Sequence, residues 1–257
     1  MTAESILAKL VSFQVLGGQS NMSIINWIKH YIESYNITTT LVSNKECNKA
    51  SLHCRIGPAI DGGVVLSGHT DVVPVKGQEW STNPFELIDK GDGKLYGRGS
   101  CDMKGFIACC LAALPDMVQA DLKKPIYFAF SYDEEIGCLA GHELAQSIRT
   151  HYRETPKYAI IGEPSLMQPI VGQKGIYILE TYVNGSAGHS SRIKEEVSAI
   201  HEAMRLILWL EEKMNQLIKE GRIDDRFHPP HSSIHVGLVN GGIAPNVIAD
   251  KAHFFWD

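Results

Sequence analysis

Four short segments that carry acidic residues lie at intervals along the chain, and each follows an apolar run that is typical of a strand. One segment also carries a histidine. In chain order the candidate residues are His69 and Asp71, then Asp102, then Glu134 and Glu135, and finally Glu163. An imidazole and several carboxylates at the ends of strands form a ligand set for divalent metal ions. The pattern therefore predicts hydrolysis by a metal-activated water molecule.

His69 and Asp71 are separated by a single residue, so on an extended segment their side chains point the same way. This spacing lets Asp71 reach the ring nitrogen of His69 that faces away from a metal, and so fix the tautomer of the imidazole. A polar strand end without a ligand role fits the same two residues, because this spacing alone is a weak pattern.

Asp102 lies between a glycine-rich turn, residues 97–99, and an expected helix that begins at Met103. A carboxylate there can bridge two cations with its two oxygens. The residue equally fits the N-cap of the following helix, where its oxygen would accept a backbone N–H.

Glu134 and Glu135 are adjacent, so their side chains diverge, and one can bind metal while the other faces a substrate. Two carboxylates at one site repel each other, which raises the proton affinity of one of them and makes it a candidate general base. Glu163 precedes Pro164 at the end of an expected strand and is a candidate terminal ligand. A solvated acidic turn and a plain loop carboxylate are the alternatives.

The elements that must position these residues form an alternation of strands and helices in the first part of the chain. The expected strands span residues 37–43, 50–56, 64–66, 126–132 and 158–161, and the expected helices span 20–35, after a cap at Ser20 or Asn21, 103–114 and 139–149. Short apolar runs between helical segments favour a mainly parallel, buried sheet. In such α/β sheets ligands bind outside the carboxyl ends of the strands, where three of the four acidic segments fall.

The pattern changes near residue 167. A strand over 170–183, a long amphipathic helix over 195–220 and two strands over 232–240 and 247–256 follow. This β-α-β-β order is an incomplete ferredoxin-like unit, which would continue with a second helix and a fourth strand. We therefore expect an α/β catalytic domain over residues 1–166 and an incomplete α+β domain over residues 167–257.

Composition excludes several classes of partner. The net charge of −5 and the pI near 6.1 give no basic footprint for nucleic acid, and no apolar run approaches the roughly 20 residues that span a bilayer. None of the 6 cysteines forms a C-x-x-C pair, so a thiolate zinc site is not expected. The first residues carry charges and do not form a secretory signal, which together with the cysteines predicts a cytoplasmic protein.

Taken in order, the four acidic segments resemble one known family. The strings S-G-H-T-D-V-V-P, G-R-G-S-C-D-M-K-G, S-Y-D-E-E-I-G and I-G-E-P are similar to those of the co-catalytic zinc deacylases and exopeptidases. This is the family of acetylornithine deacetylase, succinyl-diaminopimelate desuccinylase, aminoacylase and glutamate carboxypeptidase. The resemblance covers essentially the whole chain, and residues 188–191 and 244–248 are most similar to the acetylornithine deacetylase branch.

The resemblance implies a zinc exopeptidase-like fold and two zinc ions, for which cobalt can substitute. The implied ligands are His69, Asp102 and Glu163 for the first ion, and Asp102 and Glu135 for the second. A cis peptide bond between Asp102 and Met103 is implied as well.

The resemblance further implies which residues act on the substrate. Asp71 would orient His69, and Glu134 would be the base that deprotonates the attacking water. His189 would cross a homodimer interface and steady the oxyanion in the partner's site. Asn246 would bind the substrate carboxylate.

The chain departs from the family towards its C-terminal end. Family members continue, return to the first domain and supply a late histidine as the last ligand of the second zinc, and they carry an arginine shortly after the strand that here ends at Trp256-Asp257. Neither residue is present. We therefore expect a truncated member whose second metal site is one ligand short, with a sheet edge and apolar helix faces left exposed.

By resemblance, the expected activity is removal of an acyl group from an N-acyl amino acid, with N-acetylornithine, a compound of arginine biosynthesis, as the first candidate. A desuccinylase or a dipeptidase of the same family is a close alternative. A non-catalytic remnant, or a domain completed in trans by another polypeptide, is the other class of hypothesis. We expect a small-molecule substrate and a homodimer formed through the second domain.

Overall fold

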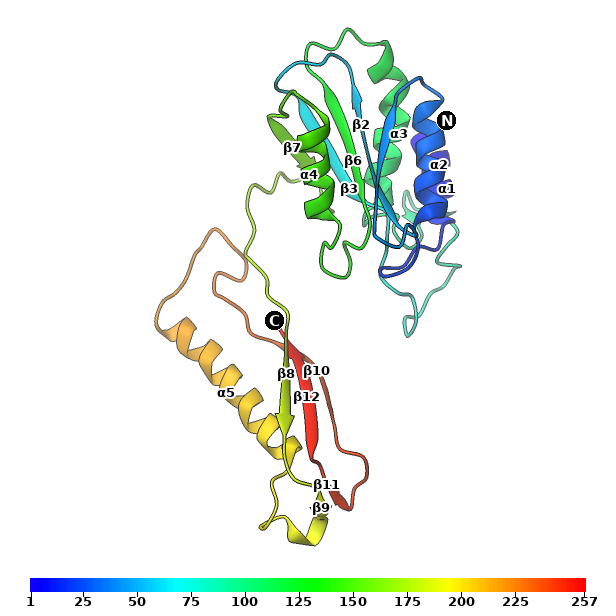
Figure 1. The fold of residues 1–257 in the computed structure, drawn as a ribbon. Helices are drawn as coiled ribbons and strands as arrows, with labels where there is room; N and C mark the ends of the chain where they lie inside the picture. The colour runs from blue at the N-terminus through cyan, green and yellow to red at the C-terminus, as the bar shows by residue number, and fades with distance from the viewer. The chain divides into compact units, whose positions relative to one another are not determined.

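A computed structural model describes the whole chain, residues 1–257. The chain divides into two compact units, Met1–Gln168 and Pro169–Asp257, which are described separately (Figure 1). None of the helices combines the length and the hydropathy that a bilayer crossing needs.

The first unit is built on a five-stranded sheet with the strand order β1-β2-β6-β3-β7. Its strands are β1 (Thr39–Ser43), β2 (Ala50–Ile56), β3 (Val64–His69), β6 (Ile126–Ser131) and β7 (Tyr158–Ile161), and a small hairpin is formed by β4 (Ile88–Asp89) and β5 (Leu95–Tyr96). β3 pairs in parallel with both β6 and β7, whereas β2 runs antiparallel to its two neighbours. The α/β class and the main strand direction expected from the sequence are confirmed.

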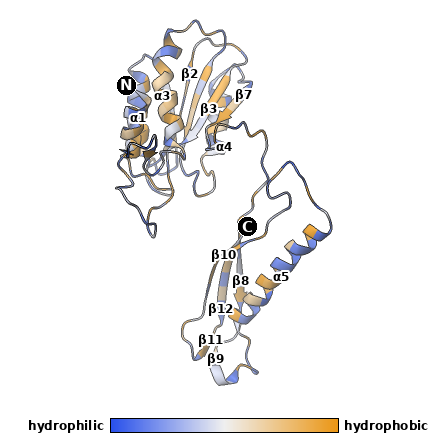
Figure 2. Ribbon diagram, turned by 180° about the vertical axis from the view of Figure 1, so that it is seen from behind, coloured by the Kyte–Doolittle hydropathy of each residue, from blue (hydrophilic) through white to orange (hydrophobic).

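Helices cover both faces of this sheet (Figure 1). They are α1 (Ala3–Val11), α2 (Met22–Glu33) and α3 (Lys104–Gln119) on one face and α4 (Gly141–His151) on the other. Side chains alternate along β6, so Phe128 and Phe130 enter the main core with α1–α3, while Ala129 packs with Leu144 and Ile148 of α4. Figure 2 shows the hydrophobic colour of the central strands between these two layers.

The start of α2 differs from the sequence prediction in its capping. Asn21 occupies the N-cap position, but its side chain makes no capping hydrogen bond. Its Nδ2 instead donates to the carbonyl of Ala50 at 2.8 Å and to the hydroxyl of Thr70 at 3.1 Å. Asn21 therefore joins the start of β2 to the segment that follows β3. Its side chain makes these tertiary hydrogen bonds in place of the local capping hydrogen bond.

One edge of the sheet is exposed. β7 pairs only with β3, and all of its residues lie exposed to solvent. Tyr158, Ile160 and Ile161 are among the exposed large hydrophobic side chains. The exposed sheet edge expected from the sequence is present here, and an apolar edge strand of this kind is open to pairing with further backbone.

The second unit is a three-stranded antiparallel sheet of order β10-β12-β8 with one long helix. Its elements are β8 (Leu179–Asn184), β9 (Gly188–His189), the 3-10 turn η1 (Ser190–Arg192), α5 (Ala199–Lys219), β10 (Val236–Gly241), β11 (Val247–Ile248) and β12 (Lys251–Trp256). Ala203 and Leu210 of α5 pack on Ala252 and Phe254 of β12. Hydrophobic and hydrophilic stretches alternate along α5 (Figure 2), as a helix with one buried face requires.

Two strand predictions in this unit are partly wrong. The strand expected over 170–183 begins only at Leu179, and the residues before it have no strand partner. The strand expected over 247–256 is divided, because β11 pairs with β9 whereas β12 pairs with β8 and β10. Residues 170–178 contain the apolar and β-branched types that favour strands, but a strand also needs a neighbour to pair with.

Candidate metal centre

The carboxyl ends of three parallel strands bring the acidic segments together. His69 is the last residue of β3, and its strand partner on β6 is Ser131, two residues before Asp133. On the other side Ser67 pairs with Ile161 of β7, which places Glu163 level with His69. The register of the sheet thus places these side chains, as expected for ligands of an open parallel sheet.

The ring of His69 is surrounded by carboxylates. Its Nε2 lies 3.0 Å from Oδ1 of Asp102, 3.8 Å from Oε2 of Glu134 and 3.8 Å from Oε1 of Glu163. One donor atom from each of His69, Asp102 and Glu135 also falls within a group in which all distances are at most 4.8 Å. The structure therefore brings all five of these predicted residues to one place.

Asp71 lies on the other side of the His69 ring, next to Nδ1. The Nδ1 of His69 lies 2.9 Å from the backbone carbonyl of Asp71 and 3.6 Å from its carboxylate. The two carboxylate oxygens accept the backbone N–H groups of Glu134 and Glu135, each at 3.2 Å. Asp71 therefore contacts the far side of the imidazole mainly through its backbone, and its side chain joins the His69 segment to the Glu134–Glu135 turn.

Asp102 does not cap the helix that follows it. Met103 occupies the N-cap position of α3 and no side chain caps this end, while the Asp102 carboxylate faces His69 at 3.0 Å. The peptide bond between Asp102 and Met103 is cis, as the family resemblance implied. The capping alternative for Asp102 is therefore not what the structure contains.

The electrostatics of the cluster favour a bound cation. Burial alone would lower the pKa of His69, but the hydrogen bond and charge of Asp71, with the charges of Glu134 and Glu163, outweigh it and raise the pKa to about 9. A metal ion binds the neutral imidazole, so metal binding here displaces a proton that the carboxylates hold in place. The same negative charges that hold the proton would hold the metal.

The pKa values of the neighbouring carboxylates also indicate a place for a cation, because crowded negative charges are costly without one. Burial, followed by the charge of Asp102, raises the pKa of Glu135. Burial also raises the pKa of Glu163; the charge of His69 opposes this, and the charges of Asp102, Glu134 and Glu135 add to it. Like charges this close repel unless a cation separates them. One imidazole nitrogen and several carboxylate oxygens are ligands that zinc accepts, so the residues present fit a divalent ion.

Burial of Asp71 and the charge on its neighbours act against each other. Burial alone would raise the pKa of this carboxyl, but the hydrogen bond and charge of His69 and the N–H groups of Glu135 and Glu134 lower it below its ordinary value. Asp71 is therefore an anion at neutral pH although it is only 1% exposed.

His189 and Asn246 lie in the second unit, next to each other. His189 belongs to β9 and pairs with Val247 of β11, and the backbone carbonyl of Asn246 accepts the N–H of Ser190 at 3.0 Å. The His189 ring is exposed, and its Nδ1 lies 2.9 Å from the hydroxyl of Ser191. The roles implied for these two residues by resemblance stay predictions.

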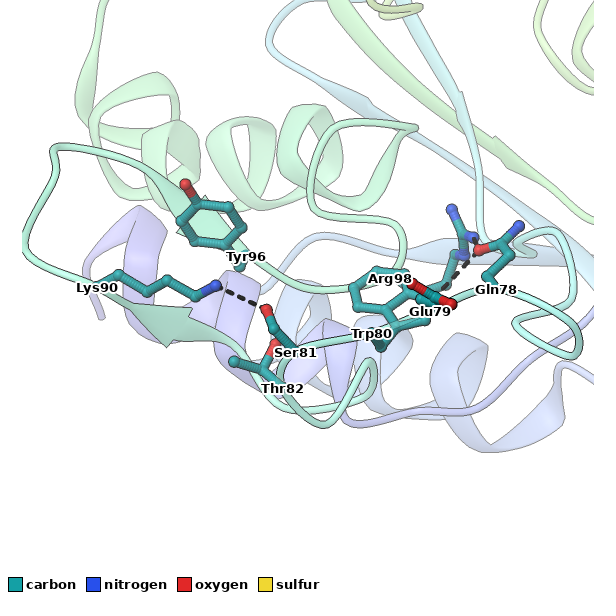
Figure 3. Close-up of a pocket in the computed structure, with 8 residues that line it drawn as sticks. All are labelled: Gln78, Glu79, Trp80, Ser81, Thr82, Lys90, Tyr96 and Arg98. Atoms are coloured by element: carbon teal, nitrogen blue, oxygen red, sulfur yellow. Dashed lines mark hydrogen bonds between the residues drawn. The ribbon is translucent and has the colours of Figure 1, made fainter.

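One hollow on the surface of the first unit is lined by none of these ligands. It is a shallow hollow of about 530 Å³ lined by Gln78, Glu79, Trp80, Ser81, Thr82, Lys90, Tyr96 and Arg98 (Figure 3). Its two cations already have partners, since Arg98 stacks on Trp80 and bonds Gln78, and Lys90 donates to Ser81 at 2.9 Å. We therefore place the chemistry at the carboxylate cluster, where the charges are unbalanced, and assign no catalytic role to this hollow.

Buried polar residues also surround the cluster, and the sequence indicated a structural role for only one of them, Lys104. Lys104, the first residue of α3, is fully buried, and its Nζ donates to the carbonyl of Phe13 at 2.8 Å. Burial lowers its pKa to about 8. Asp133 and Lys49 form a buried ion pair next to the Glu134–Glu135 turn. The sequence did not indicate the pairing of Asp133 with Lys49, because only Asp133 lies beside the candidate ligands.

The fold and the cluster define an α/β protein with a candidate divalent-metal centre at the ends of its parallel strands, and comparisons with known proteins agree. Residues 65–244 match the model of peptidase family M20/M25/M40, and the chain belongs to this family. It is 36% identical to the acetylornithine deacetylase of Klebsiella pneumoniae (strain 342) over 235 residues, which cover 90% of this chain and 58% of that protein. The chain thus spans about three fifths of the length of the curated relatives it matches.

Solved structures show the same fold. The M20 family metallo-carboxypeptidase Sso-CP2 from Sulfolobus solfataricus superposes with a TM-score of 0.69 at 16% identity, covering 100% of this chain and 70% of that one. The YXEP protein of Bacillus subtilis, described as a dinuclear metal binding peptidase of the M20 family, superposes with a TM-score of 0.56 at 18% identity, covering 99% of this chain and 62% of that one. At these identities the likeness concerns the fold.

Proposed function

We propose that the chain carries the metal centre of an amide hydrolase that removes the acyl group from an N-acyl amino acid, with N-acetylornithine as the first substrate to test. The observation that carries this proposal is the convergence of His69, Asp102, Glu134, Glu135 and Glu163 within a few ångströms. The likeness to acetylornithine deacetylases at 36% identity supports this choice of substrate.

Zinc is the proposed ion, with cobalt as a substitute. His69, Asp102 and Glu163 would hold one ion, and Asp102 and Glu135 would hold a second. A divalent ion held there would polarise the acyl carbonyl and lower the pKa of a water molecule. The side chains of Asp102 and Glu163 are 48% and 45% exposed, so the cluster is open to a substrate on one side.

Glu134 is the proposed general base. Its Oε2 lies 3.8 Å from His69 and its side chain is 34% exposed, so it faces both the cluster and solvent. Its Oε1 accepts a hydrogen bond from the thiol of Cys138 at 3.2 Å, which orients the carboxylate. Glu134 takes a proton from the attacking water as the new C–O bond forms. It returns that proton to the amide nitrogen as the C–N bond breaks, giving a carboxylic acid and a free amine.

The remaining assignments concern positioning and assembly. Asp71 holds His69 in the orientation that binds metal. His189 is proposed to steady the oxyanion across a homodimer and Asn246 to bind the substrate carboxylate, both by family resemblance. All the cysteines are free thiols, which fits the reducing cytoplasm.

The test combines metal counting with an assay of amine release from N-acetylornithine, N-succinyl amino acids and dipeptides. We expect bound zinc and release of ornithine. Glu134→Gln should keep its zinc and lose about 100- to 10,000-fold in turnover, because the base alone is removed. Glu143→Gln, which neutralises an exposed carboxylate on α4, is the matched control and should retain activity. Zinc binding without hydrolysis of any of these amides would favour a non-catalytic remnant or a partner supplied in trans.

A further inference from the structure

A buried carboxylate that is not a candidate ligand lies directly before the Glu134–Glu135 turn. Asp133 is 4% exposed, and both of its oxygens are occupied. Its Oδ1 accepts the backbone N–H of Gly18 at 2.8 Å, and its Oδ2 accepts the ammonium of Lys49 at 2.5 Å. Asp133 therefore joins the turn to two segments that lie far from it in the sequence.

The first of these segments touches the metal cluster itself. The N–H of Gly17 donates to the carbonyl of Val72, just after Asp71. A Cβ atom on Gly17 would lie 2.9 Å from Ile136 and 3.5 Å from the carboxylate of Asp71, so only glycine fits without displacing its neighbours. The backbone that Asp133 holds through Gly18 thus packs against Asp71 and Glu135.

The second segment supplies a buried cation. The side chain of Lys49 is 13% exposed and its ammonium lies 5.8 Å from the centre of the Tyr132 ring. Its backbone is fixed by the turn between β1 and β2, where its N–H donates to the side chain of Asn44 at 2.9 Å. Burying an ion pair costs desolvation of both charges, so its attraction does not translate directly into stability. The pair does join the turn before β2 to the turn that carries Glu134 and Glu135.

The backbone of Asp133 adds a second sign of constraint. Its φ is +55°, a left-handed conformation that few residues other than glycine adopt, although aspartate and asparagine tolerate it. From there the N–H groups of Glu134 and Glu135 both reach the carboxylate of Asp71 at 3.2 Å. Two carboxylates therefore hold the turn: Asp133 binds Gly18 and Lys49, and Asp71 binds the N–H groups of Glu134 and Glu135. Strained backbone of this kind gathers at functional sites.

We propose that Asp133 and Lys49 form a positioning pair that sets where the Glu135 and Glu134 carboxylates stand relative to His69 and Asp102. The inference rests on the proposed metal centre. Neither residue touches the metal or the substrate, and both act through the turn. Loss of the pair lets the turn relax, which moves Glu135 away from Asp102 and weakens the ion that these two residues share.

The decisive variant is the double substitution Asp133→Asn with Lys49→Met. Asparagine keeps the tolerance for a left-handed backbone and an oxygen for the N–H of Gly18, and methionine keeps most of the Lys49 stem without the charge. Asp133→Asn alone leaves a buried ammonium without a partner and can fail to fold. The double variant contains no such charge, so it tests positioning without that complication.

The readout is zinc affinity of the metal-free protein, measured by competition with a chelator. Glu135→Gln first identifies the zinc that Glu135 binds. The double variant should lower the affinity for that same zinc by about 10- to 100-fold and leave the affinity for the other zinc unchanged. Removing a residue that supports a metal ligand has an effect of this size. Lys49→Arg, which keeps the charge, should retain most of the affinity.

Arg55→Met is the matched control. Arg55 also forms a partly buried ion pair, with Glu154, but it lies six residues further along β2, about 20 Å away on an extended strand. It should lower the melting temperature and leave both zinc affinities intact. A double variant that binds zinc within about threefold of the wild type, or a Glu135→Gln variant that weakens no zinc, overturns the inference. A wild-type chain that binds no zinc overturns the proposed function instead.

Discussion

Two buried histidines on the same sheet have opposite surroundings. His69, at the carboxyl end of β3, is 1% exposed and has three carboxylates within 3.8 Å of its Nε2. His53, within β2, is 0% exposed, and its ring nitrogens lie 3.1 Å from the hydroxyl of Tyr152 and 3.0 Å from that of Ser147. Equal burial therefore accompanies charged partners in one case and neutral partners in the other.

The difference has a direct consequence for the two pKa values. The anions around His69 outweigh its burial and raise the pKa to about 9, while burial, together with the charge of His151, lowers the pKa of His53 to about 4. The neutral partners of His53 satisfy the ring without charging it. The anions that hold a proton on His69 can also hold a metal ion, whereas the hydroxyls around His53 carry no charge to do so. Burial alone thus does not distinguish a ligand from a structural histidine.

The largest expected effect separates the two residues by metal binding. His69→Ala removes the only nitrogen ligand of the cluster, and we expect zinc affinity to fall by well over about 100-fold, more than loss of an outer partner of a ligand costs. His53→Gln should leave zinc affinity within about twofold, because its neutral amide can still bond Ser147 and Tyr152. Chelator competition on the two variants checks this, and comparable losses in both would remove the distinction.

The second effect concerns stability against pH at His53. Its ordinary pKa of 6.5 applies in the unfolded chain and about 4 in the folded one, so between these values the unfolded state binds a proton that the folded state does not. The free energy of unfolding should therefore fall as the pH drops from 6.5 to 4, by about 1.4 kcal/mol per unit and roughly 3 kcal/mol in all. Above pH 6.5 His53 is neutral in both states, so it causes no loss of stability there.

Urea unfolding at pH 7.5, 6, 5 and 4 measures this loss, and His53→Gln serves as the reference because its side chain does not titrate. The wild type should lose more stability than the variant across that range. Carboxylates titrate in both proteins, so their contribution cancels when the two curves are subtracted. His151→Gln removes the neighbouring charge but leaves the burial of His53, so it should lose slightly less stability than the wild type. Parallel curves for the wild type and His53→Gln would show that burial does not hold the ring neutral.

Much of the first unit could be predicted because its signals are local. The strands that end near His69, Asp133 and Glu163 are short apolar runs beside turns, and their order along the chain favoured parallel pairing. The candidate ligands followed from their position at those ends. The cluster around His69 was thus accessible from the types and spacing of its residues.

The parts that could not be predicted depend on contacts between distant segments. Lys49 and Asp133 are 84 residues apart, and although Asp133 belongs to the acidic segment before Glu134, nothing in the sequence links it to Lys49. The Asn21 side chain joins Ala50 and Thr70 instead of capping its own helix, a choice that depends on what lies next to it in the fold. Residues 170–178 have strand-like composition, but pairing depends on a neighbour that composition does not specify.

A third prediction makes the surroundings of His69 more like those of His53. Asp71→Asn neutralises the buried carboxylate that lies 3.6 Å from Nδ1 of His69 and accepts two N–H groups from the Glu134–Glu135 turn. We expect a 10- to 100-fold loss of zinc affinity, the usual cost of removing a carboxylate that supports a metal-bound histidine. Asp116→Asn, an exposed site on α3, is the control in the same chelator titration. Unchanged affinity in Asp71→Asn would mean that the backbone carbonyl of Asp71 alone orients the ring.

The smallest effect tests whether the neutral partners of His53 are structural. Tyr152→Phe removes the hydroxyl at 3.1 Å from Nδ1 of His53 but keeps the ring that packs edge-on against His53 and Tyr127. One hydrogen bond is lost in a part-buried setting, so we expect the free energy of unfolding to fall by about 1 kcal/mol. Zinc affinity should not change, because this hydroxyl belongs to the region under α4. Tyr158→Phe, at an exposed ring on β7, should change neither quantity. If Tyr152→Phe instead weakened zinc, the two regions would be coupled through the sheet, and the contrast between the two histidines would have to be assigned to the whole unit and not to their immediate partners.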